Sequence, residues 1–329
     1  MKNEENLHKI KTSIGGQALM EGIMMRGPKK TAIAVRLPNK EIYLEEKKTE
    51  YIKDKYKIFN LPLLRGIGSV IDSLKIGREA MMISAQKATE LSEEDKNEGN
   101  EESRFEKWLD KTFGDNITKI IIGIGSVIGI FLSVFLFFFL PSWIYNHTVS
   151  YLPFFIGRTG RSTFEGIIKL LIFLTYMFLI SRIKDIKRVF GYHGAEHKTI
   201  FCYENREKLT VENVKKFKRF HPRCGTSFIV LMLIVGIFVG IFIPFDNPVL
   251  RAIFKIFCIP LFASLGFELI RLCSKYDNIL TRAIAAPGLW MQRISTAEPT
   301  DDMIEVAIKA MEKVIPENGE DLISKDGKT

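Results

Sequence analysis

The sequence predicts a mainly α-helical protein that crosses a membrane with about four helices and carries a small β-rich element at its N-terminus. Two observations lead to this fold class. The chain of 329 residues is 47% hydrophobic, and its apolar residues are gathered into blocks rather than spread evenly. One block, residues 120–140, has no charged side chain in 21 residues, which meets the length of about 20 that a bilayer requires.

Residues 1–60 are expected to form a cytoplasmic β-rich element. Short apolar runs within residues 14–46 alternate with glycines and with a turn at Pro38-Asn39-Lys40, a pattern typical of strands joined by tight turns. Residues 61–89 follow as an amphipathic helix that lies in the membrane interface or packs on the helical bundle. Residues 90–110 then form an acidic linker, since a segment rich in Glu and Asp with few apolar residues does not build a core.

A membrane domain is expected over residues 111–296. Its four helices are predicted at residues 120–140, 164–181, 226–243 and 249–272. Lys169 lies near the start of the second of these, where its long side chain can reach the membrane interface. The fourth contains Arg251, Lys255, Pro260 and Glu268, which lower its apolar character. Residues 297–329 are expected to form a short cytoplasmic helix, starting after Thr300, and a tail.

The distribution of basic residues predicts the orientation of these helices. There are 12 Lys and Arg residues between Arg182 and Arg223, and none between Pro244 and Pro248. By the positive-inside rule, both termini and the loop 182–225 are cytoplasmic in a bacterial plasma membrane. The formal net charge of +9 is explained by this asymmetry and by attraction to anionic lipids, so it indicates a lipid bilayer rather than nucleic acid as the partner.

The cytoplasmic loop carries the sequence His193-Gly-Ala-Glu196-His197. On a helix, positions 193, 196 and 197 fall within about 100° of arc, so two imidazoles and one carboxylate point the same way. The pattern H-x-x-E-H is the one in which inverted zinc proteases use both His side chains as ligands and the Glu as general base. It predicts His193 and His197 as metal ligands and Glu196 as a catalytic base.

A second element follows 23 residues later, at His221-Pro-Arg-Cys224-Gly225. Two potential ligands three residues apart, with Pro and Gly shaping the turn, are typical of a zinc knuckle. His193, His197, His221 and Cys224 can therefore form a closed structural set for Zn²⁺ or a similar divalent metal. Three of them can instead leave a position open for water, with Glu196 acting on it. Glu204 is a further candidate ligand. The alternative without a metal is that these His residues form hydrogen bonds with the backbone.

Two other groups of polar residues have ordinary explanations. Glu21 and Arg26 can contribute to the same site, but an ion pair between them that holds a turn is favoured. Glu268, in the fourth predicted helix, requires a partner or water if it lies within a membrane. A transporter or channel would rest only on Glu268, Lys169 and the glycines of the first predicted helix.

The motifs together resemble those of the YqhQ family of bacterial membrane proteins. They are Gly15-Gly-Gln-Ala-Leu-Met-Glu-Gly-Ile-Met-Met-Arg-Gly-Pro28, Arg65-Gly66 with Ser73-Leu74, Gly191-Tyr-His-Gly-Ala-Glu-His-Lys198, His221-Pro-Arg-Cys-Gly-Thr-Ser227 and Pro287-Gly-Leu-Trp290. The resemblance implies a domain of unknown function, described as a predicted metal-dependent enzyme without an established substrate. That description falls on His193, Glu196, His197, His221 and Cys224.

The leading hypothesis from the sequence is thus a zinc-type hydrolase acting at the cytoplasmic membrane face on a peptide or lipid-linked substrate. In it, a bound metal activates water and Glu196 is the general base. The alternative is a membrane scaffold or membrane-protein biogenesis factor, in which a closed metal site staples the loop 182–225.

Overall fold

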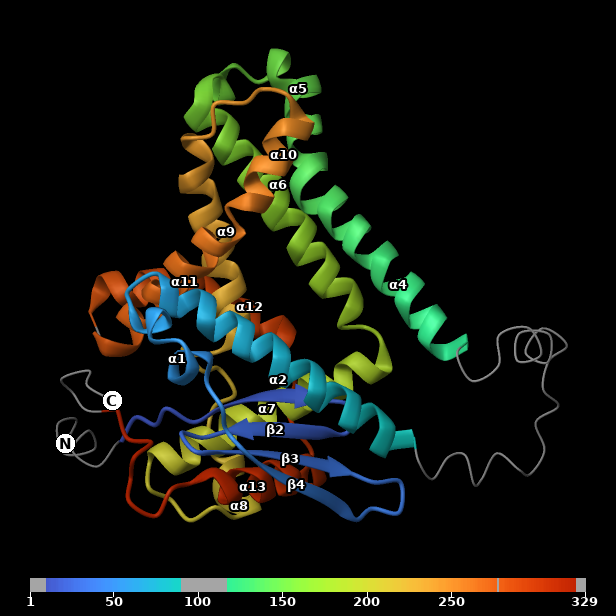
Figure 1. The fold of residues 1–329 in the computed structure, drawn as a ribbon, viewed down its shortest axis with the longest axis vertical. Helices are drawn as coiled ribbons and strands as arrows, with labels where there is room; N and C mark the ends of the chain where they lie inside the picture. The colour runs from blue at the N-terminus through green and yellow to red at the C-terminus, as the bar shows by residue number, and fades with distance from the viewer. Residues whose placement is uncertain (1–9, 90–116, 277, 324–329) are drawn as a thin grey trace, which may run out of the picture. The chain divides into compact units, whose positions relative to one another are not determined.

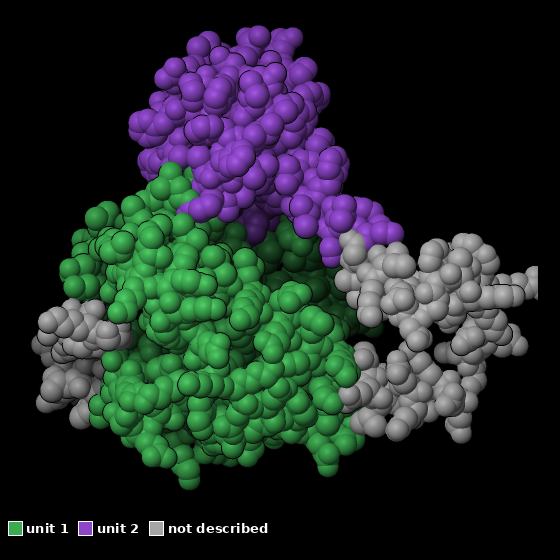
Figure 2. All heavy atoms as spheres, in the orientation of Figure 1, with its two compact units in different colours: residues 1–91, 176–232, 261–329 green, residues 92–175, 233–260 purple. Residues whose placement is uncertain are grey.

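A computed structural model of the chain describes residues 10–89, 117–276 and 278–323. The predicted acidic linker, residues 90–110, therefore lies wholly outside the described residues. The chain divides into two compact units, shown in different colours in Figure 2. Unit 1 gathers residues 1–91, 176–232 and 261–329, and unit 2 gathers residues 92–175 and 233–260.

The N-terminal element of unit 1 is a four-stranded antiparallel sheet with its strands in sequence order, as Figure 1 shows. The strands are β1 (Gly15–Leu19), β2 (Gly22–Arg26), β3 (Lys30–Arg36) and β4 (Ile42–Lys48). Each strand pairs with the next, and Met25 lies opposite Ala32 in the register of β2 and β3. The predicted β-rich N-terminus is confirmed, and the mainly helical fold class with it.

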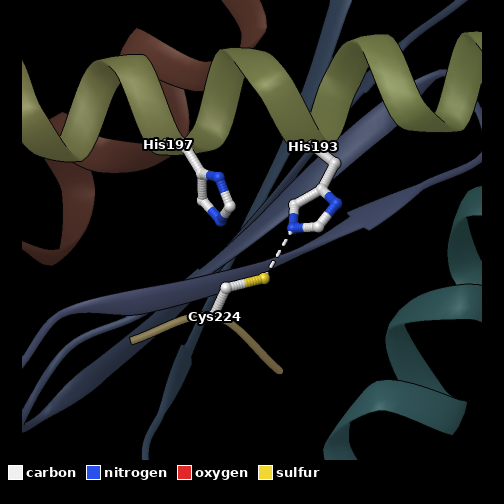
Figure 3. Close-up of side chains that lie close together, drawn as sticks. All are labelled: His193, His197 and Cys224. Atoms are coloured by element: carbon white, nitrogen blue, oxygen red, sulfur yellow. Dashed lines mark hydrogen bonds between the residues drawn. The ribbon is translucent and has the colours of Figure 1, made fainter. Parts of the chain in front are cut away.

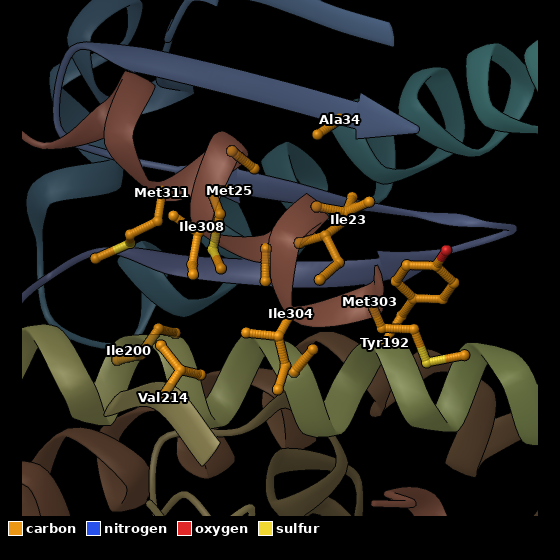
Figure 4. Close-up of a cluster of buried hydrophobic side chains, with 14 of the residues drawn as sticks. Ile23, Met25, Ala34, Tyr192, Ile200, Val214, Met303, Ile304, Ile308 and Met311 are labelled. Atoms are coloured by element: carbon orange, nitrogen blue, oxygen red, sulfur yellow. The ribbon is translucent and has the colours of Figure 1, made fainter. Parts of the chain in front are cut away.

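Helices cover both faces of this sheet. Ile23 and Met25 of β2 point into a core shared with α7 (Lys184–Glu204) and α13 (Asp301–Val314), which Figure 4 shows from the side. Met24, between them, points to the opposite face and packs with Ala80 of α2 (Leu64–Thr89). Because successive side chains of a strand alternate between its faces, β2 and β3, which have helices on both sides, are largely apolar, whereas β4 at the edge carries Glu and Lys residues.

The helix α13 belongs to the centre of unit 1. Eight of its residues are buried, and Ile304, Val306, Ala307, Ala310 and Met311 have no exposed surface. The segment after it pairs with the start of the chain, since the backbone N–H of Ile323 donates to the carbonyl of Lys11 at 2.7 Å and that of Ser13 to the carbonyl of Asp321 at 2.6 Å. Both ends of the described chain are thus fixed beside α7.

The other helices of unit 1 are shorter or connect to unit 2. They are α1 (Ile52–Lys55), the 3-10 turn η1 (Lys57–Asn60), α8 (Val211–Lys215), α11 (Ile259–Lys275) and α12 (Ile279–Ser295), while α9 (Gly225–Ile241) begins in unit 1 and ends in unit 2. Arg65 of α2 forms an ion pair with Glu268 of α11. Glu268 therefore has the partner that a carboxylate in such a helix requires.

Unit 2 consists of apolar helices. They are α4 (Ile117–Val134), the π-helical turn η4 (Phe135–Phe139), α5 (Leu140–Thr148), the short 3-10 turns η5 (Val149–Tyr151) and η6 (Pro153–Phe155), most of α6 (Gly157–Ile180), and α10 (Pro248–Phe257). Helix α6 begins seven residues before the predicted start at position 164, so Lys169 lies at its middle, twelve residues from Gly157 and eleven from Ile180. Lys169 is therefore not at the helix end that the sequence suggested.

Two helical segments of the described chain are long and apolar enough to cross a membrane, namely Ile124–Tyr151 with 28 residues and Gly157–Ile180 with 24. A third candidate is the pair of helices α10 and α11, which are bent by 53° where one ends and the other begins. Only 6% of the first segment's most apolar window is buried by the protein itself. These two to three candidate spans support the predicted association with a membrane.

Candidate metal centre

Helix α7 places the two predicted imidazole ligands on one of its faces. His193 and His197 are one turn apart, and their ring centroids are 4.4 Å from each other. Between them, Gly194 allows the chain after α12 to approach closely, because a Cβ at this position would overlap the carbonyl oxygen of Ala297. The glycine that weakens helix propensity inside the motif is therefore required by this close approach.

Cys224 completes a group of three side chains with these imidazoles. One potential ligand atom of each of His193, His197 and Cys224 lies within 4.8 Å of the others, so the group can hold a metal ion. Figure 3 shows both rings extending from the same side of α7 toward the sulfur, which comes from the segment directly before α9. The Nε2 atom of His193 is 3.1 Å from Sγ of Cys224.

Backbone carbonyls fix the orientation of both rings. Nδ1 of His193 is 2.8 Å from the carbonyl oxygen of Ser295, and Nδ1 of His197 is 2.5 Å from that of Arg219. A carbonyl oxygen only accepts, so each Nδ1 carries the proton and each Nε2 keeps its lone pair. Metal-binding histidines in proteins are held by the same arrangement.

The sulfur of Cys224 lies among hydrogen-bond donors. The backbone N–H of Thr226 donates to Sγ at 3.4 Å, and Oγ1 of Thr226 is 3.1 Å from the same atom. The thiolate is the form of cysteine that binds metals. Two imidazole nitrogens and one sulfur form a donor set that suits Zn²⁺, and in a tetrahedral site three protein ligands leave one position open.

Glu196 lies beside this group and is almost fully buried, with 5% of its surface exposed. Burial raises the pKa of its carboxyl group, while the charge that His193 has when its ring is protonated and a hydrogen bond from the backbone N–H of Gly16 oppose this increase. Gly16 belongs to β1, so the glycine-rich N-terminal segment covers the part of α7 that carries the motif. A Cβ on Gly16 would lie 2.9 Å from Cδ of Glu196.

His221 is next to the group but is not one of its three members. Its ring centroid is 5.5 Å from that of His197, and its Nε2 is 3.7 Å from a carboxylate oxygen of Glu204. Burial lowers the pKa of His221 to about 4, so the ring is neutral. The structure therefore brings together three of the four predicted ligands and turns the fourth toward a carboxylate.

Gln292 of α12 holds the backbone of His221. Its side-chain amide donates to the carbonyl of His221 at 2.7 Å and accepts from the backbone N–H of the same residue at 2.7 Å. The sequence contains no pattern that assigns this role to Gln292, or the carbonyls of Ser295 and Arg219 to the imidazoles, because each contact joins segments far apart in the chain.

Glu204, the further candidate ligand, is engaged elsewhere. It pairs with the guanidinium of Arg223 and accepts the backbone N–H of Thr12 at 3.0 Å. Although burial alone would raise the pKa of Glu204, the hydrogen bond with His221 and the charge of Arg223 lower it overall. Glu204 thus connects the segment 221–225 to the N-terminal segment.

The expected ion pair between Glu21 and Arg26 is wrong. Glu21 pairs with Arg188 of α7, and Arg26 lies 3.6 Å from a carboxylate oxygen of Asp72 and over the ring of Tyr51. Glu21 lies in the turn before β2 and Arg26 is the last residue of β2, so each side chain reaches a different helix. Neither belongs to the group of three ligands.

Comparison with known proteins places these motifs in a family. The family described as "Protein of unknown function (DUF1385)" matches residues 61–317. The chain belongs to the DUF1385 family. One member, the "Uncharacterized protein YqhQ" of Bacillus subtilis (strain 168), is 33% identical over 309 residues, which cover 94% of each chain.

The resemblance to the YqhQ family seen in the motifs is therefore confirmed. No solved structure matches the chain. The matched region of the family includes α7, the knuckle and α13, but begins after the strand that contributes Gly16. Neither the description of the family nor that of the Bacillus protein names a reaction.

Proposed function

We propose that this DUF1385 protein is a membrane-bound, metal-dependent hydrolase whose site consists of His193, His197 and Cys224. The observation that supports this proposal best is the orientation of the two imidazoles. Both donate Nδ1–H to a backbone carbonyl, which leaves both Nε2 atoms available as ligands in a group whose ligand atoms lie within 4.8 Å of one another. Hydrogen bonding to the backbone alone, which the sequence left open, would not require two rings and a thiol to converge.

An open position favours catalysis over a purely structural role. The three donors lie together while His221 is engaged with Glu204, and catalytic zinc sites commonly have three protein ligands and one exchangeable position. A bound Zn²⁺ would lower the pKa of a water molecule to about 7. In this proposal Glu196 is the group that receives the proton of that water on a carboxylate oxygen.

The environment of Glu196 suits a general base. Its carboxyl group is buried, and burial raises its pKa, which is the direction in which enzymes tune a carboxylate base. Gly16 packs closely against the carboxyl group, since a Cβ on it would lie 2.9 Å from Cδ of Glu196. Glu196 follows His193 by three residues, so α7 delivers both a ligand and the base from adjacent positions.

We further propose that four segments cross the bacterial plasma membrane. They are α4 with η4 and α5, then α6, α9, and the bent pair of α10 and α11. The 12 Lys and Arg residues from Arg182 to Arg223 support a cytoplasmic position for the loop 182–225 and both termini by the positive-inside rule. A site beside the membrane suits a peptide segment or a lipid-linked molecule as substrate.

One observation favours a second candidate function. The ring of His221 is close to that of His197, at 5.5 Å between centroids, so a side-chain rotation can bring it in as a fourth ligand. Four protein ligands would close the site and make it structural. The protein would then act as a membrane scaffold or as a biogenesis factor.

Cobalt substitution separates the two functions. The full-length protein is purified in detergent, its metal is replaced by Co²⁺, and the visible spectrum is recorded before and after addition of cyanide or a hydroxamate. An exchangeable position predicts a spectral change that saturates with the added ligand, and a closed site predicts none. If wild-type protein takes up neither Zn²⁺ nor Co²⁺ in stoichiometric amount, both functions are excluded.

The role of Glu196 requires a separate variant. We expect Glu196→Gln to retain metal, because its side chain is not one of the three donors, and to lose function in cells whose own copy has been replaced by the variant. Glu207→Gln, which neutralises a carboxylate on the loop after α7, is the matched control. Full function of Glu196→Gln would exclude its role as a base.

A further inference from the structure

Unit 2 contains a cluster of charged side chains among its apolar helices. Glu165 of α6 is 1% exposed, and Arg161, Arg251 and Lys255 around it are 5%, 2% and 3% exposed. Arg161 and Glu165 belong to α6, whereas Arg251 and Lys255 belong to α10. Charges inside membrane-spanning segments are rare, and they commonly mark ion or substrate pathways.

The single buried carboxylate of this cluster is fully engaged. Nε of Arg161 donates to Glu165 at 3.0 Å, and Nε of Arg251 donates to both carboxylate oxygens at 2.9 and 3.0 Å. The ammonium of Lys255 donates to the same carboxylate. Three cations thus share one negative charge.

Backbone carbonyls and a surface carboxylate accept hydrogen bonds from the remaining N–H groups of the two guanidinium groups. Arg251 donates to the carbonyls of Gly240 and Ile243 at 3.0 Å each. Arg161 donates to Asp246 at 2.8 Å, and the side chain of Asp246 is 94% exposed. Carbonyls stabilise the orientation of a cation but carry no net charge, so they do not balance the cluster.

Lys169 increases the imbalance. It lies one turn after Glu165 at the middle of α6, and within the described part of the chain it forms no ion pair with a carboxylate, although the charge of Glu165 attracts it. Its ammonium is 5.1 Å from the centroid of the Phe138 ring, whose face attracts a cation without neutralising it. Four cations therefore face two carboxylates, of which only Glu165 is buried.

A small cavity lies between Lys169 and Lys255. Both lysines line it, together with the carboxylate of Glu165, the hydroxyl of Ser162 and the two glycines Gly166 and Gly236, and its volume is about 10 Å³. That volume is close to what one water-sized particle requires. The cavity thus combines excess positive charge, a hydroxyl donor and space for a single small species.

We propose that this cavity binds a monatomic anion, of the chloride or bromide type, between Lys169 and Lys255. An anion there would balance the positive charge that Glu165 leaves uncompensated. Water stabilises such a charge poorly inside a membrane-spanning segment. The hydroxyl of Ser162 lines the same cavity and donates to the carbonyl of Ile237 at 2.5 Å in the structure, so it can turn toward a ligand. Size excludes polyatomic anions such as gluconate. This site is independent of the metal centre in unit 1.

Chloride binding tests the proposal directly. The full-length protein in lipid nanodiscs is equilibrated with radioactive chloride, and bound counts are measured with increasing unlabelled chloride, bromide or gluconate. We expect saturable binding of one chloride per chain, displaced by bromide and not by gluconate. Absence of saturable binding to the wild-type protein overturns the proposal, as does displacement by gluconate.

Variants and a stability measurement test whether Lys169 holds the anion. At equal ionic strength, chloride should raise the midpoint of thermal unfolding of the wild type by roughly 2–4 °C over gluconate. We expect the shift to disappear in Lys169→Met and to persist in Lys187→Met, which removes an exposed charge of α7. If Lys169→Met binds chloride as the wild type does, Lys169 is an uncharged amine or a structural residue, and the proposal is wrong.

Discussion

Nε2 of His193 lies 3.1 Å from Sγ of Cys224, although the two residues are 31 positions apart in the chain. The contact joins the middle of α7 to the segment that begins α9. It depends on the carbonyl of Ser295, from a third segment, which holds the other nitrogen of the ring. This relationship converts two separate sequence motifs into one candidate metal centre.

Replacement of Cys224 by Ser should abolish metal binding. The thiol is one of three donors, and even the loss of an outer-shell partner reduces metal affinity by roughly 10- to 100-fold. Metal content of the purified protein, measured by mass spectrometry, checks this expectation.

The matched control is Cys202→Ser. Cys202 is also buried, but its sulfur faces the carbonyls of Glu207 and Lys208, and burial raises its thiol pKa to about 11. We expect this variant to retain its metal. Equal metal loss in both cysteine variants would instead indicate unfolding or a different ligand.

His221→Ala should retain the metal and lose stability. The ring is not among the three donors, but it is buried against Glu204 and Arg223. Removing one partner of a buried polar contact costs about 1–3 kcal/mol. Metal content and the unfolding midpoint are measured on the same preparation. If metal is lost as completely as in Cys224→Ser, His221 is the fourth ligand and the site is structural.

Gly16→Ala should impair the site through Glu196. A Cβ at this position would lie 2.7 Å from the carbonyl oxygen of Met24 and 2.9 Å from Cδ of Glu196, and overpacking of this kind costs about 1–3 kcal/mol. The neighbouring Gly15→Ala is the control, because its Cβ would meet no atom within 4 Å. Thermal unfolding and cellular function are compared, and an equal response of both variants would contradict the close contact with Glu196.

Ile304→Ala should destabilise unit 1 by about 2–5 kcal/mol, the usual cost of truncating a buried isoleucine. Ile304 has no exposed surface and packs between the sheet and α7. Lys309→Ala on the exposed face of α13 should change stability by less than about 0.5 kcal/mol. Chemical unfolding in detergent measures both, and similar small effects would show that α13 is only a peripheral helix.

Features that depend on neighbouring residues were predictable from the sequence. Positions 193, 196 and 197 share one turn of α7 as their spacing indicates, and the glycine-separated runs of the N-terminus form β1 to β4. Two apolar blocks form helices of membrane-spanning length. In each case the periodicity of the backbone relates sequence spacing to geometry over a few residues.

Features that depend on packing were not predictable. Lys169 was expected near a helix end, but it lies at the middle of α6. The reason is that the polar segment Gly-Arg-Thr-Gly-Arg, which starts at Gly157, is also helical. Glu21 was expected to pair with Arg26, but β2 carries them to different helices. No local pattern indicates that α13 would fill the core beneath the sheet.

By itself, the sequence determined the class of the protein, its family and the residue types available for metal binding. The tertiary structure decided which of them meet. It brings His193, His197 and Cys224 together, turns His221 to Glu204, and places the N–H of Gly16 on Glu196. The physical reason is that ligand convergence requires side chains from separate segments to lie within a few ångströms, and only long-range packing of the sheet and helices fixes such distances.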